Sequence, residues 1–211
     1  GGSSAGVLVD NEFRIASLFR SVSKDKFDEF CRPMMARLEK EWGVPVMCIN
    51  DGEVTALAGG QSLNKNALLG IAMGTSEAVG YLDGTGKIKT WLNELAFCPV
   101  DFHPNSGVDE WSGDYGCGVQ YFSQQAVNKL AGPAGYEFPP DLKLPKRLLE
   151  VQAFQKEGQQ GAAKIYESIG TYLAYSVATY AEFYPALENV MILGRVTSGT
   201  GCDIILERAR K

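Results

Sequence analysis

A carboxylate and an amide stand side by side where a short apolar segment ends. Residues 46–49 are apolar, Asn50 and Asp51 follow them, and small residues come next. If the segment is a strand of an open α/β sheet, both side chains lie at its carboxyl end, where such sheets bind ligands. The pair also suits a turn or a helix N-cap, because both side chains accept hydrogen bonds from nearby backbone N–H groups. Asp51 is therefore a candidate catalytic carboxylate, with the local structural role as the alternative.

A second set of acidic side chains lies in a segment that is rich in aromatic residues. Glu94 and Glu110 belong to it, together with Asp101 and Asp114. The aromatic residues are Trp91, Phe97, Phe102, Trp111 and Tyr115. Carboxylates accept hydrogen bonds from vicinal hydroxyls, and aromatic faces cover the apolar face of a sugar ring. The segment is either part of a carbohydrate site or a long loop that its aromatic residues anchor.

Two glycine-containing turns are candidates for binding phosphate. One is Gly74, Thr75 and Ser76, and the other runs from Gly194 to the sequence Gly199, Thr200 and Gly201. Backbone N–H groups that no Cβ obstructs can approach phosphate oxygens closely. Neither turn matches the Walker A pattern or the three-glycine dinucleotide pattern. Considered separately, each segment is also consistent with an ordinary turn that connects two secondary-structure elements.

The pattern of apolar residues predicts an α/β protein that would position these groups. Apolar segments of strand length alternate with segments of helical periodicity, and Gly59-Gly60 is expected to end the second helix. We expect strands at residues 7–9, 46–49, 67–73, 78–82, 87–91 and 189–193. We expect helices at residues 24–42, 53–59, 161–184 and 203–210, with a loop at 93–118 and a proline-rich connector at 133–145.

Composition narrows the class of protein. The 211 residues are 45% hydrophobic and 21% charged and carry a net charge of −5, so nucleic acid is not an expected partner. No apolar run approaches the ~20 residues that span a bilayer, and no secretory signal is visible, so a cytoplasmic protein is expected. Five scattered cysteines suit reduced thiols, and no metal site is predicted, although Cys98, His103 and Cys117 remain an open alternative.

Together these segments resemble the sugar kinases of the hexokinase and actin-like ATPase superfamily, with bacterial glucokinases and the ROK family (repressor, open reading frame, kinase) most similar. The resemblance implies an actin-like ATPase fold of the ribonuclease H-like type. It makes Asp51 the general base and assigns sugar binding to Asn50, Glu94, Glu110 and Ser4. It assigns nucleotide binding to Gly74, Thr75, Ser76, Gly194, Gly199, Thr200 and Gly201. Ser76 stands where the family usually has glycine, and Phe97 where it has histidine.

The resemblance also implies a division of the chain and an incomplete site. Residues 1–52 would be the remaining part of lobe one, and residues 53–211 most of the second lobe. These kinases begin with a strand pair around an Asp-x-Gly-Gly-Thr loop that holds magnesium and phosphates, and this sequence has no such loop. We therefore expect an incomplete enzyme.

The expected activity is phosphoryl transfer from ATP, with Mg²⁺, to a hydroxyl of a hexose-type sugar. The partners would be a sugar and a nucleotide, and a homodimer is possible. The main alternative is a catalytically inactive sugar-binding or regulatory protein of the same fold. A third hypothesis, an acyl-CoA dehydratase activator, requires closely spaced cysteines for an iron–sulfur site, and the cysteines here are widely spaced.

Overall fold

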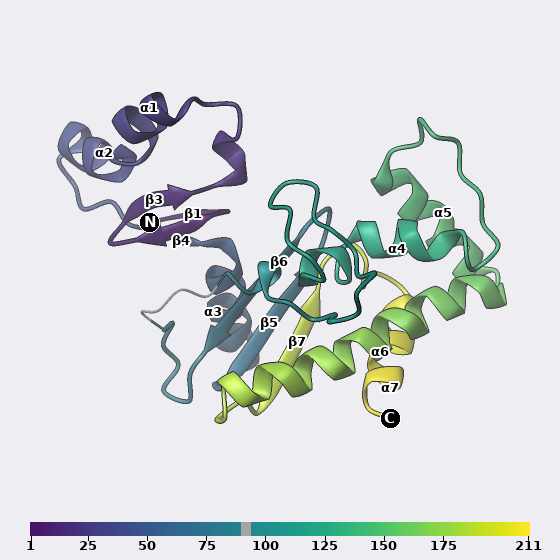
Figure 1. Ribbon diagram of the computed structural model, residues 1–211. Coiled ribbons are helices and arrows are strands. Elements are labelled where there is room, and N and C mark those ends of the chain that lie inside the picture. Colours follow the sequence, from purple (N-terminus) through teal and green to yellow (C-terminus); the bar gives the residue numbers. More distant parts are fainter. Residues whose placement is uncertain (90–93) are drawn as a thin grey trace.

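The computed structural model describes residues 1–89 and 94–211 (Figure 1). At the N-terminal end, β1 (Gly2–Ser4) pairs in parallel with β4 (Cys48–Asn50), and β2 (Val7–Val9) pairs antiparallel with β3 (Glu12–Ile15). The predicted strand at residues 7–9 is thus confirmed. The strand predicted at 46–49 begins two residues later and includes Asn50, so Asp51 falls in the following helix.

The single helix predicted at residues 24–42 is interrupted in the structure. A short α1 (Lys24–Lys26) continues into a π-helical turn, η2 (Phe27–Cys31), and α2 (Met34–Trp42) begins after Pro33. Proline lacks a backbone N–H group and its ring crowds the preceding turn, which explains the break. As predicted, the helix ends at Gly43, whose φ of 66° is readily adopted by glycine. A 3₁₀ turn, η1 (Ser17–Phe19), connects β3 to these helices.

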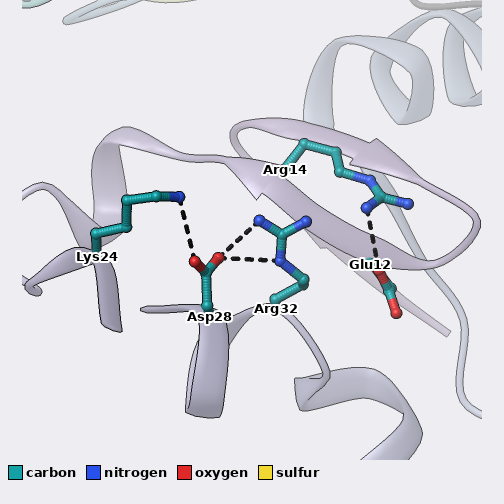
Figure 2. Close-up of polar contacts among 5 residues, drawn as sticks. All are labelled: Glu12, Arg14, Lys24, Asp28 and Arg32. Atoms are coloured by element: carbon teal, nitrogen blue, oxygen red, sulfur yellow. Dashed lines mark hydrogen bonds and ion pairs between the residues drawn. The ribbon is translucent and has the colours of Figure 1, made fainter. Parts of the chain in front are cut away.

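Several ion pairs lie on the surface of this N-terminal part (Figure 2). Asp28 accepts hydrogen bonds from Lys24 Nζ at 3.2 Å and from Arg32 Nη2 at 2.7 Å, while Arg14 pairs with Glu12 at 3.2 Å. The bonds from Arg32, and then the one from Lys24, lower the pKa of Asp28. Exposed pairs of this kind contribute little net stability. The buried side chains of Phe13, Ala16, Met35 and Cys48 form the hydrophobic core here.

The helix after β4 is longer than predicted. It is α3 (Asp51–Leu63), which continues through Gly59 and Gly60 and ends at Asn64 with a φ of 50°. The prediction that Gly59-Gly60 ends the helix is therefore wrong. A Cβ at Gly59 would lie 2.2 Å from Met191 Cε, and one at Gly60 would lie 2.3 Å from Leu82 Cδ2. These glycines allow α3 to pack closely against Met191 and Leu82. Their role is therefore to permit this packing and not to end the helix.

A three-stranded sheet forms the centre of the rest of the chain. Its order is β6 (Glu77–Leu82), β5 (Leu68–Met73) and β7 (Asn189–Leu193), with β5 antiparallel to β6 and parallel to β7. The predicted hairpin and the predicted strand at 189–193 are confirmed. For the strand predicted at 87–91, the described part shows one isolated bridge, between Leu82 and Ile88. Residues 90 and 91 lie outside the described residues.

After β6 the chain forms a long loop, and the helices that follow this loop cover the sheet. The loop contains two 3₁₀ turns, and four α-helices follow, of which the long α6 and the C-terminal α7 were predicted (Figure 1). These elements are η3 (Leu95–Phe97), η4 (Gly118–Gln120), α4 (Gln124–Ala131), α5 (Leu144–Lys156), α6 (Gln160–Phe183) and α7 (Gly201–Ala209). Among residues 1–89 and 94–211, no helix is both long and apolar enough to cross a lipid bilayer.

The largest hydrophobic core lies between the sheet and these helices. Ile71 and Tyr81 of the sheet are buried with Phe122, Tyr166 and Ile169 of the covering segments. The N-terminal core described above shares no residue with this one. The division of the chain into residues 1–52 and 53–211 remains a prediction.

The start of α3 against β6 generates a stability prediction. A Cβ at Gly52 would lie 2.3 Å from the carbonyl oxygen of Val79, a backbone atom that cannot move aside cheaply. We expect Gly52→Ala to lower the free energy of unfolding by about 1–3 kcal/mol, although alanine is normally the better helix former. Urea unfolding measures this change. Gly132→Ala is the control, because no heavy atom lies within 4 Å of its added Cβ and its φ is −56°. Equal stability of the two variants would contradict the prediction.

Candidate functional site

A cavity of about 650 Å³ opens beside the carboxyl end of β4. Asp51, the first residue of α3, lines it together with Glu94, Phe97 and Trp111 of the long loop. Gly6, in the turn between β1 and β2, contributes to the facing wall. The structure therefore brings together Asp51 and Glu94, two of the site residues proposed from the sequence.

Asn50 joins the two sides of this cavity. It is the N-cap of α3, where its Oδ1 accepts from Gly52 N at 2.8 Å. Its Nδ2 donates to the carbonyl oxygen of Gly6 at 2.9 Å and to Glu94 Oε2 at 2.7 Å. Both amide hydrogens are therefore used within the protein. The N-cap interpretation of Asn50 is correct, and this geometry makes the residue a positioning group for Glu94.

Glu94 is held in an environment that disfavours its charge. Burial, followed by repulsion from Asp51 and Glu53, raises the pKa of Glu94 to about 7, against the lowering effect of the bond from Asn50. Near neutral pH the carboxyl group is thus present in both protonation states. It can donate a hydrogen bond when protonated and only accept when ionised.

Glu77 lines this cavity as a residue and carries a buried carboxyl group that sequence reasoning missed. It is the first residue of β6, directly after Ser76, and only 6% of its surface is exposed. Both carboxyl oxygens are buried without a hydrogen-bond partner in the protein. Burial raises its pKa well above the ordinary value. The sequence did contain a signal, because an acid heads an otherwise apolar strand.

The aromatic wall of the cavity is fixed by the loop that carries it. The rings of Phe97 and Trp111 pack with their centroids 5.4 Å apart. Asp109, which is 6% exposed, accepts from Trp111 N at 3.1 Å and from Ser112 N at 2.8 Å. Gln120 Nε2 donates to the other oxygen of Asp109 at 3.1 Å. A buried carboxylate thus holds the turn that places Trp111.

Glu110 lies in a neighbouring cavity of about 460 Å³. This second cavity also contains Arg20, Thr75 and Ser76, and Glu110 is exposed there. Glu110 does not line the cavity of Asp51 and Glu94. The two cavities share Ser17, Ser76, Phe97 and Trp111 as wall residues.

The two glycine turns meet at the carboxyl end of β5. Gly74 N donates to Ser76 O at 3.0 Å, which closes the first turn and leaves Thr75 and Ser76 exposed. Gly194 has a φ of 104°, and a Cβ there would lie 2.5 Å from Met73 O. Only glycine fits this conformation and this approach. The requirement for Gly194 is thus explained by packing alone.

The end of the second turn lines a third cavity, of about 390 Å³. Gly199, Thr200 and Gly201 contribute to it, facing Tyr166 of α6 and Gln155 of α5. The Tyr166 hydroxyl and Gln155 Oε1 are both buried and lack a hydrogen-bond partner in the protein. The Tyr166 hydroxyl can donate and accept a hydrogen bond, and Gln155 Oε1 can accept one. Both groups are therefore available to a ligand of this cavity, beside a glycine turn.

The remaining candidates do not join these cavities. The Ser4 hydroxyl donates to the carbonyl oxygen of Ala5 at 3.2 Å, and Ser4 is not a lining residue of the cavity of Asp51. Within the described ranges, no three His, Cys, Asp or Glu side chains are arranged to hold a metal ion. The alternative of a site built from Cys98, His103 and Cys117 is therefore wrong. Trp91 of the predicted aromatic segment lies outside the described residues.

Comparison with solved structures identifies the fold. A ROK hexokinase from Thermus thermophilus superposes with a TM-score of 0.68 at 19% sequence identity, over 85% of this chain and 60% of that one. A ROK family glucokinase from Streptomyces griseus, solved with glucose and AMPPNP, gives 0.69 at 18% identity, over 99% and 68%. A ROK family transcriptional regulator, a homologue of the E. coli MLC protein, gives 0.66 at 18% identity, over 85% and 46%.

The chain has the actin-like ATPase fold of ROK sugar kinases, as the sequence resemblance implied. It spans about 60% of the length of the Thermus hexokinase and less than half of the regulator. No family model matches the sequence. No curated protein matches it either.

The environment of Glu94 generates a pH prediction. Because its pKa is raised from 4.5 to about 7 on folding, the folded protein loses stability as the pH rises from near 4.5 to about 7. Glu94→Gln keeps an acceptor for Asn50 and cannot ionise, so it should be more stable than wild type above this range and similar below it. Thermal unfolding across the range measures the difference. The control is Glu150→Gln, at an exposed position in α5. A constant difference for Glu94→Gln would contradict the assignment.

Proposed function

We propose that this chain carries the sugar and nucleotide sites of an ATP-dependent kinase that phosphorylates a hydroxyl of a hexose-type sugar. The observation that supports this most directly is one cavity that is lined by Asp51, Glu94 and a packed aromatic pair. This cavity shares Ser76 with the cavity of the Gly74–Ser76 turn. The fold is that of proteins that include a glucokinase solved with glucose and a nucleotide analogue.

In this proposal the sugar binds in the cavity of Asp51. Asp51 accepts the proton of the reacting hydroxyl, because it lies at the start of α3 and lines the cavity, where among the described residues only its Oδ1 is used, as acceptor from Gly52 N at 3.1 Å. Glu94 holds a second hydroxyl, and Asn50 keeps its carboxyl group in place. The faces of Phe97 and Trp111 cover the ring. Catalysis then consists mainly of positioning and electrostatic stabilisation.

The nucleotide would occupy the other two cavities. Thr75 and Ser76 offer exposed hydroxyl and N–H groups to the phosphates. Gly199, Thr200 and Gly201, with the unpartnered groups of Tyr166 and Gln155, suit a polar heterocycle. An adenine amino group can donate to Gln155 Oε1, and a ring nitrogen can accept from the Tyr166 hydroxyl.

Magnesium would accompany the nucleotide. Protein-bound Mg²⁺ usually keeps several waters and takes phosphate oxygens with one or two carboxylates. The described residues have no arrangement of three ligands for a metal, so they do not form a separate protein-built cation site.

A sugar-binding regulator is the second candidate. A ROK family transcriptional regulator shares the fold, which supports it. Ser76 in place of the usual glycine and Phe97 in place of histidine, both noted in the resemblance, favour lost phosphoryl transfer. The dependence of ATP consumption on sugar distinguishes the two candidates. A kinase consumes ATP in proportion to sugar, whereas a regulator binds sugar without turnover.

Asp51→Asn tests the proposed base. In a complete enzyme, we expect it to lower kcat for sugar phosphorylation by about 10²–10⁴-fold, because asparagine cannot accept the proton. Sugar affinity, measured by calorimetry, should change little, because the amide still pairs with a hydroxyl. The control is Glu150→Gln, far along the chain in α5. Turnover within threefold of wild type would remove Asp51 from this role. If the wild-type protein, tested as a complete enzyme, binds sugar but gives no turnover, the regulator is the better assignment.

Tyr166→Phe tests the nucleotide cavity. The change removes a buried hydroxyl that has no partner in the protein. We expect it to weaken binding of ADP about fivefold, the effect of one neutral hydrogen bond of about 1 kcal/mol. Calorimetry with ADP measures this. The matched control is Tyr136→Phe, since the Tyr136 hydroxyl donates to Gln159 Oε1 at 3.1 Å on the surface. Unchanged ADP affinity in Tyr166→Phe would contradict the assignment.

A further inference from the structure

A series of side-chain hydrogen bonds, the Lys129–Gln120–Asp109 network, links α4 to the turn that carries Trp111. Lys129 Nζ donates to Gln120 Oε1, and Gln120 Nε2 donates to Asp109 Oδ1 at 3.1 Å. Asp109 Oδ2 accepts from the backbone N–H groups of Trp111 and Ser112, at 3.1 Å and 2.8 Å. Lys129 is exposed, whereas Gln120 and Asp109 are 3% and 6% exposed. A surface cation is therefore connected, through two buried groups, to the backbone of this turn.

The charges at the two ends of this network select one orientation of the Gln120 amide. A lysine ammonium group only donates hydrogen bonds, and an ionised carboxylate only accepts them. Reversal of the amide would turn its amino group toward Lys129 and its oxygen toward Asp109, so both ends would be mismatched. Gly107 leaves room for the ammonium group, since a Cβ there would lie 2.9 Å from Lys129 Nζ. Lys129 thus favours the orientation in which Gln120 holds Asp109.

The ring of Trp111 depends on this turn for its position. Trp111 is 38% exposed, so the hydrophobic core does not enclose it, and its ring packs on that of Phe97 with the centroids 5.4 Å apart. Both residues line the cavity of Asp51. Asp109 N also closes the turn, because it donates to Asp114 O at 2.9 Å. A shift of Asp109 would therefore move the Trp111 ring relative to the cavity.

We propose that Lys129 is a positioning residue for sugar binding, which acts through Gln120 and Asp109 to keep the Trp111 ring against the sugar. The binding role rests on the proposed function, because the ring belongs to the sugar cavity of that proposal. Lys129 is not among the described lining residues of that cavity, and it lines instead a small separate cavity of about 70 Å³. Its effect on the sugar is therefore indirect and passes through the turn.

Fluorine NMR tests the positioning without any ligand. Fluorotryptophan labels the three tryptophans, and Trp111→Phe and Trp42→Phe identify two of the signals. We expect Lys129→Met to shift or broaden the Trp111 signal and to leave that of Trp42, in α2, unchanged. Lys146→Met, at an exposed position in α5, is the control and should leave both signals unchanged. An unchanged Trp111 signal in Lys129→Met overturns the proposal, even if the variant is less stable, because a merely stabilising role would leave the ring in place.

A double-mutant cycle tests the route of this effect. Gln120→Leu replaces the amide by an apolar group of similar size, so it interrupts the network at its centre. Two residues that act through a shared partner have non-additive effects. We therefore expect Lys129→Met to displace the Trp111 signal in wild type and to displace it much less in the Gln120→Leu background. Equal displacement in both backgrounds overturns the route through Gln120.

Glucose affinity measures the consequence for the ligand. By calorimetry, we expect Lys129→Met to weaken glucose binding about fivefold, within the range that one aromatic contact contributes, and Lys146→Met to leave it unchanged. In a Trp111→Ala background, Lys129→Met should cause no further loss, because the ring on which it acts is absent. Glucose affinity equal to wild type in Lys129→Met overturns the binding role and leaves the proposed function standing. Absence of glucose binding by wild type contradicts the proposed function, whereas the fluorine spectrum still decides the positioning.

Discussion

The site depends on the hydrogen bonds of one side chain, Asn50. Its carbonyl oxygen starts α3, and its two N–H groups hold the Gly6 turn and the Glu94 carboxyl group. The turn at Gly6, the start of α3 and the loop at Glu94 are therefore all held by the same side-chain amide. Because Asp51 is the next residue, its position relative to Glu94 is set by the same group. Replacement of this amide would remove the donor to the Gly6 carbonyl and to the Glu94 carboxyl group, at a cost of about 1–3 kcal/mol for each, whereas Gly52 N would keep its bond to Asp51 Oδ1.

Small residues allow the elements to approach closely enough for this arrangement. Gly52 and Gly80 bring the start of α3 onto β6, and Gly194 seats the second glycine turn on the end of β5. The carboxyl end of β5 thus gathers both turns at one edge of the sheet. This is the edge at which α/β sheets generally bind ligands. Packing requirements and the proposed binding function therefore select the same residue type at Gly194.

The sequence predicted the elements whose apolar pattern is regular, including the β5–β6 hairpin, α6 and β7. It failed where a residue has two possible local roles. Gly59-Gly60 was interpreted as a helix end, because glycine often ends helices, but its role is close packing against Met191 and Leu82. The break at Pro33 follows from a proline that helical periodicity alone does not register.

The candidate site could be predicted from the sequence only for residues that are adjacent in the chain. Asn50 and Asp51 are adjacent in sequence, and their place at the end of β4 followed from the apolar segment before them. Glu110 was assigned to the same site as Glu94, yet the turn held by Asp109 directs it to the neighbouring cavity. Glu77 and Tyr166 were missed because burial without a partner is a property of the packed protein, which no sequence pattern expresses.

The shared wall between two of the cavities has a thermodynamic consequence. Phe97 and Trp111 border both the cavity of Asp51 and the cavity of Thr75. A molecule that shifts either ring in one cavity changes the shape of the other, so the two binding free energies are coupled. Such coupling is reciprocal, because each ligand must alter the affinity of the other by the same factor. If the proposed sugar and nucleotide occupy these cavities and either one moves a shared ring, each would therefore change the affinity of the other.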